Sequence, residues 1–211
     1  MALLDDISEQ LQKGKKKKVV EFCQQALDEG IPAGEILNNG LLAGMDIVGA
    51  KFKANEIFVP QVLVAARAMN AGAELLKPHL QAGEAINAGK ICMGTVKGDL
   101  HDIGKNLVVM MVESAGFEVI DLGVDVSAET FIEAIRENPD TKLVGLSALL
   151  TTTMPAMAEI VAELNKQDFR PNIRIMVGGA PITQEFADRI GADAYTENAA
   201  EAAVVAKKLV S

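Results

Sequence analysis

Strand-like and helix-like segments alternate along the second half of the chain, and this alternation narrows the possible folds more than any other feature. Short β-rich apolar runs predict strands at residues 90–96, 117–121, 143–147, 172–177 and 193–195. Longer segments predict helices at residues 104–115, 127–137, 153–166, 182–189 and 198–209. Such alternation is typical of a parallel sheet covered by helices on both faces. Because crossovers are right-handed, it favours a five-stranded, flavodoxin-like (Rossmann-like) α/β domain.

The first part of the chain shows helical patterns and no strand pattern. Helices are predicted at residues 3–11, 15–28, 41–52 and 60–76, with a further short helix that opens at 32–35. The short connections between them predict a small antiparallel bundle. Residues 79–87 are small and polar, which indicates a linker. We therefore expect an all-α helical domain at residues 1–86 and the α/β domain at residues 87–211.

Composition and charge exclude several classes of protein. The 211 residues suffice for one large or two modest domains, and the net charge of −9 disfavours binding to nucleic acid. No apolar run reaches membrane-spanning length, and the N-terminus lacks the features of a signal peptide. Cys23 and Cys92 do not make a disulfide framework, which predicts a reducing, cytoplasmic location. The lysine cluster at 13–18 is either a solvated helix start or a docking patch for an acidic partner.

His101 lies on the predicted loop between the first strand and the first helix of the α/β part. This loop stands at the carboxyl end of a parallel strand, where ligands of open α/β sheets bind. Asp99 is placed to accept a hydrogen bond from one ring nitrogen of His101, which leaves the other nitrogen free as a ligand. Gly104 has no side chain to obstruct a bulky ligand. The alternative is a structural or surface histidine.

The rest of the sequence offers no partners for a conventional metal site. A zinc site needs three or four protein ligands, but the other histidine is His79 and the two cysteines are far apart in sequence. A macrocycle supplies its own equatorial nitrogens, so one axial histidine suffices, as in haem proteins. A single oriented histidine therefore suggests a macrocyclic metal cofactor.

The loops after the third and fourth predicted strands carry polar and small residues: Ser147, Leu149, Thr151, Gly178 and Gly179. In a flavodoxin-like order the first and third strands flank the point where a crevice opens, so these loops converge with the histidine loop. Each residue also has a structural alternative. Ser147 could be an ordinary strand-end hydroxyl, the glycine pair a turn, and one of the threonines 151–153 a helix cap.

Together these residues resemble the three-part signature of cobalamin-binding domains. The parts are Asp99-x-His101-x-x-Gly104, Ser147-x-Leu149 and Gly178-Gly179, and their order and spacing both match. They are similar to the signature of methionine synthase and of the small corrinoid proteins of methyltransferase systems. The resemblance implies that cobalamin binds with its dimethylbenzimidazole base off the cobalt and its tail threaded into the Rossmann-like domain.

The resemblance also implies roles for individual residues. His101 would be the axial ligand of the cobalt, Asp99 its hydrogen-bonding partner, and Thr153 the residue that completes a proton relay, which takes up a proton as the histidine leaves. The implied cofactor-binding residues besides Asp99 and His101 are Asp102, Ile103, Gly104, Ser147, Leu149, Thr151, Gly178 and Gly179. Ser147 and Thr151 would bind the tail or the corrin amides, and the two glycines would leave room for the tail.

A second resemblance covers the helical part. Residues 44–49 and 58–62 are similar to the cap module of methionine synthase, so the likeness spans nearly the whole chain. It implies that Phe52, Val59 and Val62 cover the upper face of the cobalt, where a reactive metal needs protection from water and oxidants. The alternative is that these three residues belong to the core of the bundle.

The implied function is that of a corrinoid methyl carrier, not catalytic by itself, because the chain has no room for a barrel-shaped methyl donor or acceptor domain. A substrate-specific methyltransferase would load the cobalt. A second methyltransferase would pass the methyl group to an acceptor such as tetrahydrofolate or a thiol, and a reductive activator would rescue Co(II). No partner is expected among nucleic acids or membranes.

Three alternatives belong to other functional classes. A generic flavodoxin-like binding or signalling domain would not explain the joined loops and the helical cap together. The B12-binding subunit of an adenosylcobalamin-dependent mutase shares the signature but usually lacks such a helical cap. A cobalamin-based sensor would carry a DNA-binding domain and a tryptophan in its bundle, and this sequence has no tryptophan. Methylamines, glycine betaine, methanol and methoxylated aromatics all remain open as methyl donors.

Overall fold

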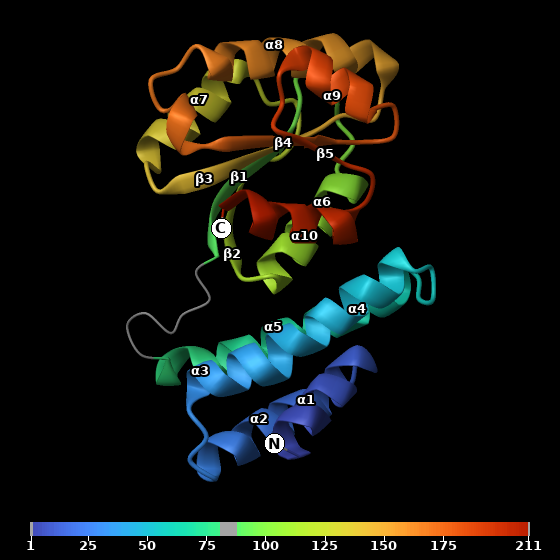
Figure 1. Cartoon of the computed structure of the whole chain (residues 1–211), viewed down its shortest axis with the longest axis vertical. Helices are drawn as coiled ribbons and strands as arrows, with labels where there is room; N and C mark the ends of the chain where they lie inside the picture. The colour runs from blue at the N-terminus through green and yellow to red at the C-terminus, as the bar shows by residue number, and fades with distance from the viewer. Residues whose placement is uncertain (1, 81–87, 211) are drawn as a thin grey trace. The chain divides into compact units, whose positions relative to one another are not determined.

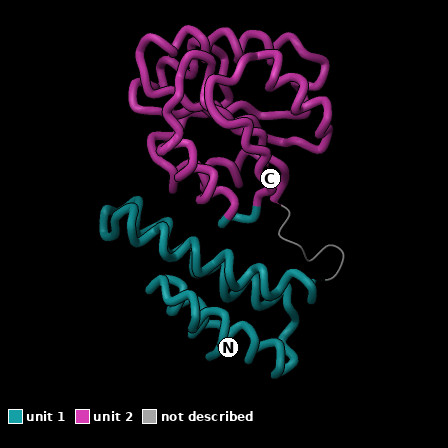
Figure 2. The backbone as a smooth tube through the Cα atoms, turned by 180° about the vertical axis from the view of Figure 1, so that it is seen from behind, with its two compact units in different colours: residues 1–87, 114–116 teal, residues 88–113, 117–211 magenta. Residues whose placement is uncertain are grey.

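The computed structural model describes residues 2–80 and 88–210, which form two compact units (Figures 1 and 2). One unit comprises residues 1–87 and 114–116, and the other comprises residues 88–113 and 117–211. Most of the predicted linker, residues 81–87, lies outside the described residues. Within the described ranges, no helix is both long and apolar enough to cross a membrane.

The described part of the first unit contains helices joined by short connections and no strand, as predicted. Its elements are α1 (Ala2–Gln12), α2 (Lys16–Asp28), α3 (Ala33–Glu35), the π-helical segment η1 (Ile36–Leu42), α4 (Ala43–Lys53), α5 (Val59–Leu76) and the 3-10 turn η2 (Lys77–His79). The two separate helices predicted at 32–35 and 41–52 are instead one continuous helical run. Gly40 does not interrupt this run, because it serves packing: a Cβ there would lie 3.1 Å from Cγ2 of Ile7.

Close approach between helices characterises the bundle. A Cβ on Gly72 of α5 would lie 2.9 Å from the methyl carbons of Leu41, so a larger residue at this crossing would displace the Leu41 side chain. The buried core includes Ile7, Leu11, Val19, Cys23, Ile36, Leu41, Met69 and Leu76. Burying one large aliphatic side chain is worth about 1.5–3 kcal/mol, so this packing stabilises the bundle without a large contribution from polar contacts.

The second unit is a parallel five-stranded sheet with helical crossovers. Its elements are β1 (Gly89–Thr95), α6 (Ile103–Ser114), β2 (Phe117–Asp121), α7 (Ala128–Glu137), β3 (Thr141–Ser147), η3 (Thr151–Thr153), α8 (Met154–Asn165), η4 (Arg170–Asn172), β4 (Arg174–Gly178), α9 (Gln184–Ile190), β5 (Ala194–Thr196) and α10 (Ala199–Val210). The strand order β2-β1-β3-β4-β5 is that of flavodoxin-like folds. The predicted fold class is therefore confirmed.

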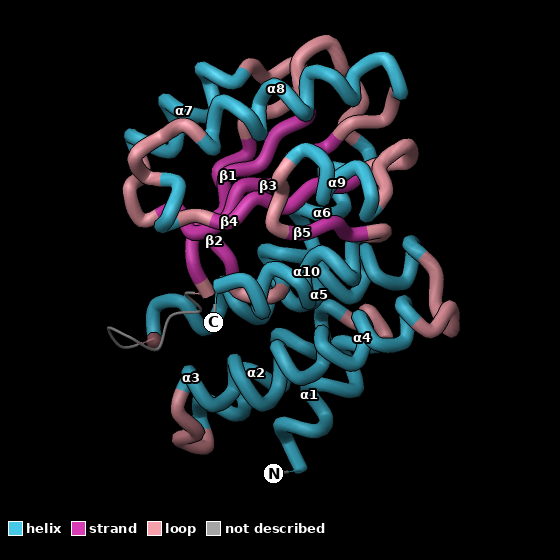
Figure 3. Tube along the Cα trace, turned by 45° about the horizontal axis from the view of Figure 1, so that its top comes forward, coloured by secondary structure: helices cyan, strands magenta, loops and turns pink. Residues whose placement is uncertain are grey.

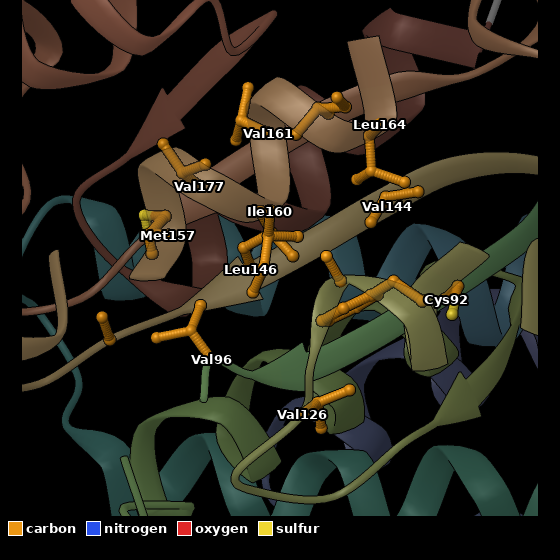
Figure 4. Packing of buried hydrophobic residues seen from close by; sticks show 14 of the residues in the cluster. Cys92, Val96, Val126, Val144, Leu146, Met157, Ile160, Val161, Leu164 and Val177 are labelled. Carbon is orange, nitrogen blue, oxygen red and sulfur yellow. The ribbon is translucent and has the colours of Figure 1, made fainter. Parts of the chain in front are cut away.

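Helices cover both faces of the sheet. Helices α7, α8 and α9 lie over one face, and α6 and α10 lie over the other (Figures 1 and 3). Figure 4 shows the first of these layers, where Val144 and Leu146 of β3 and Val177 of β4 meet the side chains of α8. The apolar residues that α8 contributes there are Met157, Ile160, Val161 and Leu164. This packing makes the sheet a rigid support for the loops at its edge.

The register of the sheet aligns the carboxyl ends of four strands. Thr95 pairs with Ser147, Ser147 with Gly178, and Gly178 with Thr196. The loops that follow β1, β3 and β4 therefore all begin at the same edge of the sheet. The predicted site residues of the second unit lie at the last residues of β3 and β4, in the segments that follow β1, β3 and β4, and in the first turn of α6.

Candidate functional site

The loop between β1 and α6 is fixed by hydrogen bonds to its own strand. The Thr95 hydroxyl donates to the carbonyl oxygen of His101 at 2.9 Å, and the Asp99 N–H donates to the carbonyl oxygen of Val96 at 3.1 Å. Gly98 has a φ of +81°, a conformation that glycine adopts without steric cost. The turn therefore folds back on β1 and presents Asp99 and His101 at the edge of the sheet.

The carboxylate of Asp99 is fully buried and joins two loops. Its Oδ1 lies 2.7 Å from His101 Nδ1 and accepts the His101 backbone N–H at 3.1 Å. Its Oδ2 accepts the N–H groups of Leu149 at 2.7 Å and Leu150 at 3.3 Å, both from the loop after β3. The Thr153 hydroxyl donates to the same oxygen at 2.9 Å. The structure thus brings Asp99, His101 and Thr153 together.

Asp99 is ionised in this setting. Burial alone raises the pKa of a carboxyl, but the hydrogen bonds from Leu149, His101 and Thr153 outweigh it and hold the pKa of Asp99 well below its usual range. An ionised carboxylate only accepts hydrogen bonds, so His101 Nδ1 carries the hydrogen that it shares with Asp99. In the neutral ring, Nε2 then keeps a free lone pair and can bind a metal.

His101 stands among exposed apolar side chains. Its own side chain is 51% exposed, and Ile103 and Leu100 beside it are 86% and 72% exposed. Leu149 and Leu150, on the loop that Asp99 joins to this one, are also exposed. Uncovered apolar groups of this kind mark binding surfaces. The sequence prediction missed Leu100 and Leu150, although apolar residues in loops directly after strands were a usable signal.

Open space adjoins this apolar surface at the start of α6. A Cβ on Gly104 would meet no atom within 4 Å, so nothing in the described protein demands glycine there. Within residues 2–80 and 88–210, no group of three or more His, Cys, Asp or Glu side chains is placed to hold a metal ion. One histidine with a free nitrogen, apolar neighbours and open space fit a broad macrocycle that brings its own metal. The donor set does not fit a bare metal ion.

Ser147 and the threonines differ from one another in their contacts. In the described protein, the half-buried Ser147 hydroxyl has no hydrogen-bonding partner, and Thr151 is exposed on η3. Thr153 occupies the N-cap position of α8 without capping it, because its hydroxyl lies 2.9 Å from both Asp99 Oδ2 and the carbonyl oxygen of Leu150. The alternative that one of these threonines caps the helix is therefore wrong.

The glycine that ends β4 and the glycine that follows it both lie close to the protein's own backbone. A Cβ on Gly178 would lie 3.1 Å from the carbonyl oxygen of Thr196. Gly179 has a φ of +132°, and a Cβ there would lie 1.8 Å from the carbonyl oxygen of Ala148. Packing between neighbouring strands and loops accounts for both residues, whereas room for a cofactor tail stays a prediction.

Asp102 is exposed at the start of α6 and accepts a hydrogen bond from the side chain of Asn106 at 3.1 Å.

The predicted cap residues of the helical unit occupy different environments. Phe52 on α4 is half-buried, and Val59 at the start of α5 is exposed. Val62 is 1% exposed and shares the buried stripe of α5 with Ala66 and Met69. Val62 is therefore buried in the described protein, whereas Val59 is not. The covering of cobalt by these residues stays a prediction.

Family comparisons agree with this geometry. A model described as a B12 binding domain matches residues 89–205, and a second model with the same description matches residues 3–77. These matches cover the α/β unit and the helical unit in turn. The chain is thus built of B12-binding domains.

Individual relatives narrow the class further. The chain is 45% identical to dimethylamine corrinoid protein 3 of Methanosarcina acetivorans, over 99% of this chain and 97% of that protein. A solved cobalamin-binding protein from Desulfitobacterium hafniense is similar with a TM-score of 0.84 and 30% identity, covering 99% of this chain and 98% of the other. The methanol:cobalamin methyltransferase complex of Methanosarcina barkeri contains a similar chain, with a TM-score of 0.85, 31% identity and coverages of 99% and 80%. The chain therefore belongs to the family of B12-binding corrinoid proteins of methyltransferase systems, and its cofactor is a cobalamin.

Proposed function

We propose that this protein carries a methyl group on the cobalt of its corrinoid and that His101 Nε2 is the lower axial ligand, with the benzimidazole base of the cofactor displaced. The observation that carries the proposal is the Asp99–His101 pair, with 2.7 Å between Oδ1 and Nδ1. The ionised carboxylate holds the hydrogen on Nδ1, which directs the lone pair of Nε2 outward. When bound, the cobalt supplies the centre that accepts and releases the methyl group.

The residues around His101 hold its ring in place. Were His101 to release the metal and take up a proton on Nε2, the Asp99 carboxylate would still accept the Nδ1 hydrogen. Thr153 donates to the opposite oxygen of Asp99 and keeps the carboxylate turned toward the ring. The three residues thus form a continuous hydrogen-bonded chain through which a proton can be gained or lost, as the predicted relay requires.

The helical unit, residues 1–86, is proposed as a cap, and Phe52, Val59 and Val62 as the residues that cover the upper side of the cofactor. The exposed Val59 supports this assignment, as does the exposed Phe58 next to it. Residues 87–211 bind the cofactor. In the proposed division of labour the cap shields the reactive metal from water, and the α/β unit supplies the ligand.

The proposed partners are enzymes of methyl transfer. A substrate-specific methyltransferase loads the protein, a second methyltransferase unloads it onto an acceptor, and a reductive activator rescues Co(II). The solved methanol:cobalamin methyltransferase complex supports the first of these. We place the protein in the cytoplasm, because Cys23 and Cys92 are free and buried as reduced thiols. The net charge of −9 supports the absence of a nucleic-acid partner.

The test identifies the nitrogen that binds cobalt. Protein uniformly labelled with ¹⁵N is loaded with unlabelled hydroxocobalamin and reduced to Co(II), and its EPR spectrum is recorded. A histidine ligand gives the two-line coupling of ¹⁵N, whereas the cofactor's own base gives the three-line coupling of ¹⁴N. We expect the two-line pattern, its loss in His101→Ala and its retention in the control His79→Ala. A three-line pattern in the wild type would refute the His101 assignment.

A further inference from the structure

The loop between β2 and α7 contains a backbone conformation that L-residues avoid. Asp125 has a φ of +56°; of the other described non-glycine residues, only Asn55 shares a positive φ. Gly123, two residues earlier, has a φ of +82°. Two residues of this short loop thus have a positive φ. Unfavourable conformations persist where surrounding contacts determine them, and Asp125 makes such contacts with the histidine loop.

Asp125 holds the histidine loop by two hydrogen bonds in opposite directions. Its side-chain Oδ1 accepts the N–H of Gly98 at 2.7 Å, and its own N–H donates to the carbonyl oxygen of Asp99 at 3.0 Å. The two bonds bracket the Gly98–Asp99 dipeptide. Because φ is positive at Asp125, its N–H and its carboxylate both reach the same short segment.

Further bonds anchor the β2–α7 loop to the end of β1. The Thr95 N–H donates to the carbonyl oxygen of Gly123 at 2.9 Å, and the Val126 N–H donates to the carbonyl oxygen of Thr95 at 3.0 Å. Val96 and Val126 also form a parallel bridge. The loop is thus fastened to β1 on both sides of Asp125, so it can act as a rigid bracket for the residues that follow the strand.

We propose that Asp125 is a positioning residue for His101, a role that rests on the proposed function of His101 as the axial ligand. The side chain of Asp99 ties the histidine loop to the loop after β3, and Asp125 ties the backbone of the same segment to the loop after β2. With both ties intact, the Asp99–His101 pair is held in one orientation. Without the Asp125 side chain, the Gly98 N–H loses its acceptor, and the segment depends on the bonds of Asp99 to Val96 and to the loop after β3. His101 is then held less tightly.

Two substitutions distinguish the role of the Asp125 side chain from that of its backbone conformation. Asp125→Gly accepts the positive φ but removes the acceptor for Gly98. Asp125→Asn is the matched control, since asparagine tolerates a positive φ and its amide oxygen can still accept. We expect Asp125→Gly to bind hydroxocobalamin about fivefold more weakly and to show a smaller fraction of histidine-coupled Co(II) by EPR, while Asp125→Asn stays within about twofold of the wild type. Wild-type affinity and coupling in Asp125→Gly would overturn the proposal.

A measurement without cofactor tests the same bracket independently. We expect the Gly98 amide of the wild-type apoprotein to exchange its hydrogen slowly by NMR, and that protection to be lost in Asp125→Gly. Exchange of the wild-type Gly98 amide at the rate of an open loop would also overturn the proposal, even if the glycine variant failed to fold. Failure of the ligand assignment is distinguishable, because it would show as missing histidine coupling in the wild type itself.

Discussion

Asp99→Asn tests the site most directly, because an amide cannot replace a carboxylate that only accepts. In the wild type, one oxygen faces His101 Nδ1 at 2.7 Å and the other faces the Leu149 N–H at 2.7 Å. Asparagine has a single carbonyl oxygen and must turn its NH₂ group toward one of these partners. If the NH₂ group turns toward Leu149, it faces the buried Leu149 N–H, and two donors meet without an acceptor. If the NH₂ group turns toward His101, it donates to Nδ1, and the ring hydrogen moves to Nε2.

Both orientations disturb the site. The first leaves buried donors without an acceptor, and the second places a hydrogen on the nitrogen that must bind the metal. Each removes hydrogen bonds to a charged group, which are worth about 1.5–3 kcal/mol. Since about 1.4 kcal/mol corresponds to a factor of ten, we expect affinity for the corrinoid to fall roughly 10- to 100-fold.

Visible titration of the apoprotein with hydroxocobalamin measures this affinity, and EPR of the Co(II) form measures the occupancy of the histidine ligand. Asp168→Asn is a matched control, because Asp168 is exposed and its carboxylate accepts the N–H of the neighbouring Phe169. We expect the control to bind like the wild type. An Asp99→Asn protein with wild-type affinity and full histidine coupling would refute the view that this carboxylate orients the ligand.

Three further predictions concern stability and the thiols. The pKa of Asp99 is lowered in the folded protein, so the stabilising contribution of its carboxylate declines as pH falls below about 4. The difference in unfolding free energy between the wild type and Asp99→Asn should therefore shrink below that pH. A difference that stays constant with pH would contradict this. Gly179→Ala should lower the unfolding free energy by at least about 3 kcal/mol in urea melts, because its Cβ would clash with the Ala148 carbonyl oxygen. Gly123→Ala also has a positive φ but meets no atom, so it should lower the unfolding free energy by about 1 kcal/mol. Equal losses in the two variants would contradict the clash. Burial raises the pKa of Cys23 and Cys92 to about 12, so a thiol reagent at pH 8 should label them only after unfolding, and rapid labelling of folded protein would argue against their burial.

The sheet was predictable because its signals are local. Each strand is a short apolar run, and β2 begins and ends where the sequence predicted, at Phe117 and Asp121. The order then follows from crossover handedness, which acts on every such chain. The helical run from 33 to 53 was less predictable. Gly40 looks like a helix end in the sequence, and only the position of Ile7 on another helix shows why a glycine stands there.

The same distinction separates the parts of the site. Asp99 and His101 are two residues apart, so their pairing was visible in the sequence, and the Thr153 contact followed from the resemblance. Asp125 carries no such signal, because the sequence separates it from Gly98 by 27 residues. Its role also depends on a positive φ, which aspartate tolerates but which its presence in a sequence does not predict. Gly179 is the opposite case, because its place in a binding motif suggested that it leaves space for a ligand. In the structure, the atom nearest to a Cβ at this position is the Ala148 carbonyl oxygen. Residues that hold a ligand-bearing loop from another strand are therefore identified by backbone conformation and reciprocal hydrogen bonds, and the chemistry of their side chains alone does not reveal them.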